Sequence, residues 1–187
     1  MTVDRRRIRD KIRQYRLSDS DFDGVDAWDR AQLITGDGLN KVLQSIEQKL
    51  KGLDAQKIHA TKNIVLELAG NTLLHGPKRS ATPEMLLVTR HRGVVTVWMF
   101  GSGRKDQIRR LNQIITNIRD MAEPPDHQDE LLRRRNLELL RRTSLPPSKQ
   151  HGGGTGMMTI AALSSEPLWF LSEFSRGEAS FALRSVV

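Results

Sequence analysis

Glu67, Asn71 and His75 form a polar row with a spacing of four residues. Apolar residues at 64, 65, 68, 69, 72 and 73 recur in the same stretch with the period of an α-helix. The three polar side chains are therefore expected beside the apolar face of one helix, which Gly76-Pro77 should end. A carboxylate, a carboxamide and an imidazole in a row can hold a metal ion and the water or hydroxyl that it orients. Such a row alone is more often a solvated helix edge.

A glycine-rich stretch, His151 to Met158, is the second motif that could do chemistry. Its consecutive glycines allow backbone N–H groups to approach an anion closely, and it opens directly onto an apolar helical pattern. The start of that helix would add a partial positive charge. Together the two motifs predict a nucleotide phosphate and a metal ion held between them.

The composition limits the classes of protein to which this chain can belong. A chain of 187 residues fits one domain, and the absence of cysteine excludes disulfides and thiolate metal sites. No apolar run approaches the roughly 20 residues that span a bilayer, and the basic N-terminus lacks the apolar segment of a signal peptide. We therefore expect a cytoplasmic protein without a membrane span.

The formal net charge of +8 is unevenly distributed. Residues 4–16 hold seven Lys or Arg against two Asp, residues 19–29 hold five Asp, and a second basic cluster spans 133–149. The basic stretches lack the interleaved aromatic residues that stack on bases, so nucleic acid is not the expected partner. An acidic protein partner, a polyphosphate or plain solubility would account for the charge equally well.

Grouped helical and strand patterns predict an α+β fold. Residues 5–16 favour a short basic helix, expected to be mobile or loosely packed, and 19–29 are expected to be a linker. The remaining elements are a first strand at 30–35, helices from 37 and from 54 or 55, a hairpin of 85–90 and 94–100 around Arg92-Gly93, two helical patterns within 104–143, a helix from 156 to about 164, and a closing hairpin of 168–174 and 179–187. We expect a two-layer sandwich in which one mixed sheet is covered by helices on one face.

The order of these parts resembles the GHKL superfamily of ATPases and kinases, whose fold is called the Bergerat fold. The segment Glu67–His75 resembles its N box, Gly101-Ser102-Gly103 lies where its G1 box follows a strand, and residues 152–157 resemble its G2 box. The resemblance covers about residues 30–187. In finer detail the chain looks like the SiaB-type protein kinases, bacterial relatives of the anti-sigma-factor kinases. It implies an extension and linker at 1–24 and a kinase domain at 25–187, with a lid and helical insert at about 104–156.

This resemblance implies an ATP- and Mg²⁺-dependent serine/threonine protein kinase in bacterial signalling. Its substrate would be a small cytoplasmic protein, SiaC-like or anti-anti-sigma-like, and the kinase itself could form a homodimer. Glu67 would be the catalytic base and Asn71 the Mg²⁺ ligand. The residues implied in ATP binding are Asn71, His75, Gly101, Gly103, Gly152, Gly153, Gly154, Thr155 and Gly156.

One position departs from the superfamily pattern. The G1 box normally carries an Asp that accepts a hydrogen bond from the adenine amino group, and Met99 stands there in this chain. The loss of one such bond weakens nucleotide binding by roughly ten- to a hundred-fold. The alternative reading is therefore a degenerate GHKL domain that binds a nucleotide or a partner without catalysis. A histidine-kinase-like domain or simple ATPase is a further alternative, and a nucleic-acid-binding protein is the last.

Overall fold

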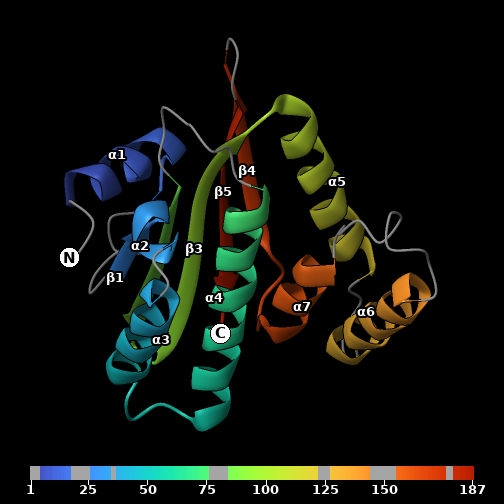
Figure 1. The fold of residues 1–187 in the computed structure, drawn as a ribbon, viewed down its shortest axis with the longest axis horizontal. Helices are drawn as coiled ribbons and strands as arrows, with labels where there is room; N and C mark the ends of the chain where they lie inside the picture. Colours follow the sequence, from blue (N-terminus) through green and yellow to red (C-terminus); the bar gives the residue numbers. More distant parts are fainter. Residues whose placement is uncertain are drawn as a thin grey trace.

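The structure is a computed structural model of the whole chain. It describes residues 5–17, 26–34, 37–75, 84–121, 127–143, 155–175 and 179–187, and the account below concerns these. The α+β class expected from the sequence is confirmed (Figure 1).

One five-stranded sheet runs through the domain in the order β1-β2-β3-β5-β4. The strands are β1 (Asp26–Asp29), β2 (Met85–His91), β3 (Val94–Gly103), β4 (Trp169–Phe174) and β5 (Ala179–Val186). Every neighbouring pair is antiparallel, where the sequence predicted a mixed sheet. The reason is that the last hairpin inserts β5 between β3 and β4, which separates the two strands that run in the same direction.

Helices cover one face of this sheet. They are α2 (Arg30–Ile34), α3 (Gly38–Lys49), α4 (Ala55–His75), α5 (Lys105–Met121), α6 (His127–Thr143) and α7 (Thr155–Leu163). The main core lies between this layer and the sheet, where Ile46, Ile64 and Ile160 are fully buried against Leu86 and Val97. Helix α6 packs on α7 at the outer margin of the layer (Figure 1).

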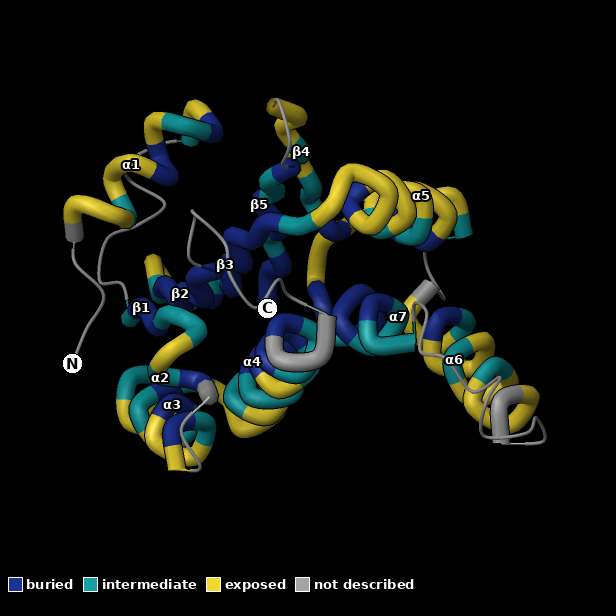
Figure 2. Tube along the Cα trace, turned by 45° about the horizontal axis from the view of Figure 1, so that its top comes forward, coloured by how far each residue is buried: buried dark blue, intermediate teal, exposed yellow. Residues whose placement is uncertain are grey.

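Helix α1 (Arg5–Tyr15) packs on the opposite face of the sheet, so the helices do not all lie on one side (Figure 2). Ile12 and Tyr15 are buried in a second core with Trp98 and Phe100, and the Tyr15 and Phe100 rings lie 5.6 Å apart. Burial raises the pKa of Tyr15 to about 12. Residues 5–17 are therefore part of the folded domain rather than a loosely packed tail, because the narrow apolar stripe of α1 matches the large apolar side chains of β3.

The prediction of a first strand at residues 30–35 is wrong. The strand is β1, within the stretch expected to be a linker, and α2 begins at Arg30. The Asp29 carboxylate accepts a hydrogen bond from the Gln32 backbone N–H (3.1 Å), and the Gln32 side chain accepts one from the Asp29 N–H (2.9 Å). This reciprocal capping box starts a helix at the point where the apolar pair Leu33-Ile34 indicated a strand.

The other expected elements are confirmed, except that β3 continues to Gly103, past the end expected at residue 100. Helix α4 begins at Ala55, where Asp54 caps it by accepting a bond from the Gln56 N–H (2.7 Å). The turn between β2 and β3 lies at Arg92-Gly93, and both residues have positive φ, as a tight hairpin turn requires. The two helical patterns of 104–143 are α5 and α6, and the final hairpin is β4 and β5.

Candidate functional site

Helix α4 positions the Glu67 and Asn71 side chains. Its buried positions, Ile64, Val65 and Leu68 among them, lie on the sheet and fix the rotation of the helix about its axis. Glu67 and Asn71 consequently lie together along one flank, where both are partly buried. Among the described residues, the structure gives neither side chain a hydrogen-bond partner.

The N-terminal end of α7 meets this flank directly. A Cβ atom built on Gly156 would lie 2.7 Å from the Glu67 Oε2 and 3.4 Å from the Asn71 Nδ2. Only glycine allows the carboxylate to approach the helix backbone so closely. The structure thus brings together two sequence motifs that lie about 85 residues apart, as the resemblance implied.

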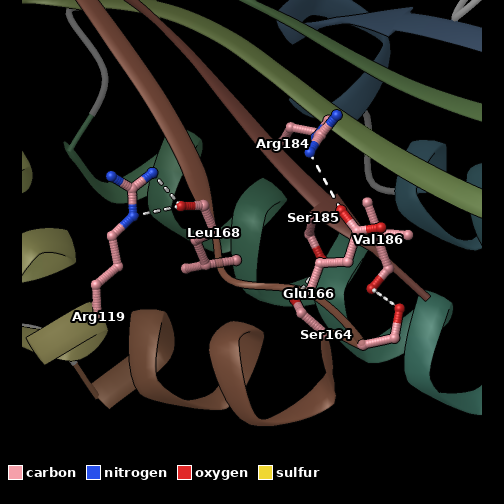
Figure 3. A network of polar contacts seen from close by, with 8 residues as sticks. Arg119, Ser164, Glu166, Leu168, Arg184, Ser185 and Val186 are labelled. Atoms are coloured by element: carbon pink, nitrogen blue, oxygen red, sulfur yellow. Dashed lines mark hydrogen bonds and ion pairs between the residues drawn. The ribbon is translucent and has the colours of Figure 1, made fainter. Parts of the chain in front are cut away.

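A polar network holds the opposite end of α7 in place (Figure 3). The Ser164 and Ser185 hydroxyls share a hydrogen bond of 2.6 Å, and the Val186 carbonyl accepts one from the Ser165 N–H at 2.7 Å. From α5, the Arg119 guanidinium donates to the Leu168 carbonyl just before β4 (2.7 Å from Nε). Because the end of the helix is tied to β5, and α5 is tied to the entry of β4, the N-terminus of α7 has a fixed place beside Glu67.

The donor set fits a magnesium ion better than a transition metal. Across the described ranges, no cluster of three or more His, Cys, Asp or Glu side chains could hold a metal by itself. Mg²⁺ keeps several waters and uses one or two protein oxygens together with substrate phosphates. The Asn71 carboxamide supplies such an oxygen, and the backbone N–H groups at the start of a helix such as α7 favour a phosphate.

Met99, in the C-terminal half of β3, lies on the face of the sheet that α4 covers. Met99 is buried there, and its sulfur accepts a hydrogen bond from the Thr72 hydroxyl on α4 at 3.7 Å. A thioether therefore lies at this position of β3, against the residue of α4 that follows Asn71. No acidic side chain stands at that point of the strand.

Gly101 and Gly103 have packing reasons to be glycine. A Cβ on Gly101 would lie 2.5 Å from the ring of Phe181, its cross-strand neighbour on β5. A Cβ on Gly103 would lie 3.3 Å from Ile108 of α5. Contacts within the domain are enough to explain both residues, and their expected contact with a nucleotide stays a prediction.

Several predicted site residues lie outside the described part of the chain. They are Gly152, Gly153 and Gly154 of the glycine-rich stretch and the side chain of His75, whose backbone is the last residue of α4. Thr155 is the first residue of α7 and is partly buried. The described site therefore consists of Glu67, Asn71, Thr155 and Gly156.

Two helical glycines provide a matched test of this geometry. Replacing Gly156 with Ala is expected to push the Glu67 carboxylate aside, at little cost to folding, because the obstructing atom is the end of a flexible side chain. Replacing Gly70 with Ala meets no described atom within 4 Å and should stabilise α4 by about 0.5–1 kcal/mol. Urea unfolding and nucleotide binding of both variants check this. Equal nucleotide binding by the two variants would contradict the assigned site.

Comparison with known proteins supports the fold. No protein-family model matches the chain, and no curated protein sequence matches it. A chain in "The crystal structure of SiaB-SiaC complex from Pseudomonas aeruginosa" is similar over its full length, with a TM-score of 0.68, 19% identity and coverage of 100% of both chains. At this identity the similarity establishes the fold alone. Within the described residues, no helix is long and apolar enough to cross a membrane.

Proposed function

We propose that the protein is a Mg²⁺- and ATP-dependent serine/threonine protein kinase of the SiaB type, acting on a small partner protein in bacterial signalling. The observation that carries the proposal is the junction of α4 and α7, where Gly156 lies against Glu67 and Asn71. A carboxylate, an oxygen ligand for magnesium and a helix N-terminus are the groups that phosphoryl transfer to a hydroxyl needs.

Each described residue has a distinct role in this proposal. Asn71 holds the metal through its carboxamide oxygen, and the backbone at Thr155 and Gly156 donates hydrogen bonds to phosphate oxygens. Glu67 accepts the proton of the partner's Ser or Thr hydroxyl while the oxygen of that hydroxyl attacks the γ-phosphorus and ADP departs. Bound Mg²⁺ and ATP would supply the electrophilic γ-phosphoryl group. The anchored C-terminal end of α7 keeps these groups at a fixed separation.

The partner class rests on the structural similarity. The similar chain comes from a complex of SiaB with SiaC, which supports a protein as the binding partner of this chain as well. Its substrate would then be SiaC-like or anti-anti-sigma-like, with the hydroxyl presented to Glu67.

A non-catalytic binding module is the second candidate, and Met99 favours it. The sulfur is buried against Thr72 and cannot accept a hydrogen bond from adenine as a carboxylate does. A domain of this kind would hold its partner, with weak nucleotide binding or none.

A thermal-shift titration with ATP, ADP and GTP, with and without Mg²⁺, separates the two candidates. Ligand at about 100 times its dissociation constant adds roughly 2.7 kcal/mol of stability, which corresponds to a shift of about 5–10 °C for a domain of this size. We expect a Mg²⁺-dependent shift with ATP that is lost in Asn71→Ala. No shift with any nucleotide at millimolar concentration would favour the binding module.

A further inference from the structure

We propose that the solvent-facing side of α1 binds anionic phospholipids and holds the domain on a negatively charged membrane surface without insertion. The proposal does not depend on the kinase activity. It starts from an arginine row along this helix, which consists of Arg6, Arg9, Arg13 and Arg16. At 3.6 residues per turn, the first three lie within an arc of about 60°. Arg16 follows directly after the last residue of the helix.

Contacts with the sheet fix the orientation of the arginine row. Near the start of α1, the Arg7 guanidinium donates to the Asp29 carboxylate of β1 at 3.4 Å. Near its end, the Gln14 carboxamide donates to Glu173 of β4 at 3.0 Å and to Ser180 of β5 at 3.1 Å. The apolar side of the helix is buried in the second core between these contacts. The helix therefore cannot turn about its axis, and the arginine row is exposed along its whole length.

The arginine row carries positive charge that the domain does not neutralise. Within the described part of the chain, Arg9, Arg13 and Arg16 form no ion pair with a carboxylate. The sequence of α1 holds five arginines and one lysine against Asp10. A basic residue held near an anionic bilayer strengthens adsorption about fivefold, so three together correspond to roughly a hundredfold.

The chemistry of this surface favours a lipid layer over a protein or a nucleic acid. Among the described side chains of α1, the exposed ones are arginines and Asp10, so the surface lacks the apolar core typical of protein interfaces. Tyr15 is buried, and no exposed aromatic ring of α1 is present to stack on bases. A narrow row of charges can contact a flat layer of phosphate head groups along its whole length.

The position of α1 in the fold is compatible with such attachment. Figure 2 shows α1 on the opposite side of the sheet from α4 and α7, which carry the candidate site. Adsorption through α1 therefore leaves the junction of α4 and α7 directed away from the membrane. A ligand or partner protein could reach that junction from solution while the domain is attached.

Cosedimentation of the full chain with lipid vesicles tests the proposal. The vesicles contain phosphatidylcholine alone, or phosphatidylcholine with an equal amount of phosphatidylglycerol. We expect at least tenfold higher affinity for the anionic vesicles, and a decrease in that affinity as the salt concentration rises. The double variant Arg9→Gln/Arg13→Gln should bind the anionic vesicles about thirtyfold more weakly than wild type. Arg9→Lys/Arg13→Lys keeps the charge and should bind as wild type does.

The matched control is Lys105→Gln/Arg110→Gln on α5, which removes the same charge from exposed residues on the other face of the sheet. Its affinity for the anionic vesicles should stay within about threefold of wild type, because salt screens charges that lie far from the membrane. Equal affinity of the wild type for both kinds of vesicle would overturn the proposal. Equal losses in the two glutamine variants would also overturn it, because net charge alone would then explain the binding. Binding to duplex DNA but not to anionic vesicles would assign the arginine row to a nucleic acid instead.

Discussion

Replacement of Glu67 with Gln is expected to slow phosphoryl transfer by about 10²- to 10⁴-fold and to leave nucleotide binding nearly unchanged. The amide has the shape of the carboxylate and fits beside Gly156, where the Glu67 Oε2 now lies. It cannot accept the proton of the attacking hydroxyl, so only the chemical step should suffer. The rate of transfer would be measured as the label that passes from γ-³²P-labelled ATP to a SiaC-like protein. In the absence of a partner protein, the rate of ADP formation would be measured.

The control for this substitution is Glu47→Gln on α3. That carboxylate is 62% exposed and pairs with Lys62 at 2.8 Å, away from the α7 terminus, so its loss should change neither binding nor transfer. If Glu67→Gln transfers phosphate at the wild-type rate, the assignment of the base is wrong. If it loses Mg²⁺-dependent ATP binding instead, Glu67 acts as a ligand of the metal rather than as the base.

The sequence was sufficient to predict the helices of the site, because their signals are local. The apolar period around Glu67 and Asn71 predicts α4, and the apolar run after Gly156 predicts α7. The contact between the two helices depends on the path of about 80 intervening residues. The two motifs alone predicted a phosphate and a metal ion between them, and the resemblance implied the same, but the close approach of Gly156 to Glu67 required the structure.

Elements whose stability depends on distant residues were harder to predict. The stripe of Ile12 and Tyr15 indicates a helix, but its packing surface at Trp98 and Phe100 lies more than 80 residues away. The start of α2 is a different case, because the capping box of Asp29 and Gln32 is a local signal that the strand prediction overlooked.

Gly101 illustrates how one residue supports two explanations. In the sequence it lies where the G1 box of the GHKL superfamily follows a strand, and the resemblance implies that it contacts ATP. In the structure it lies opposite Phe181, whose ring occupies the space of a Cβ. The β3–β5 register, which creates this neighbour, cannot be read from either strand alone.

Replacement of Arg30 with Ala is expected to lower the free energy of unfolding by about 2–4 kcal/mol at pH 7.5. The Arg30 guanidinium donates to the Glu84 carboxylate at 3.1 Å, and the Glu84 side chain is only 5% exposed. Without Arg30 this carboxylate would be buried without its ion-pair partner. Glu84→Gln in the same background removes the charge, so the double variant should be more stable than Arg30→Ala alone.

The loss of stability in Arg30→Ala should also depend on pH. Burial raises the pKa of Glu84 above its usual value, and the charge of Arg30 opposes that rise. Removing Arg30 therefore raises the pKa further, so the folded state binds a proton more tightly than the unfolded state. A raised folded-state pKa contributes stability at low pH that is lost as the pH rises through that pKa.

The difference in unfolding free energy between Arg30→Ala and wild type should thus be largest near neutrality and shrink as the pH falls toward the usual pKa of Glu. Urea unfolding across this pH range would measure it. A difference that is independent of pH would show that Glu84 stays ionised in the variant, and that Arg30 stabilises the fold through its packing rather than through this ion pair.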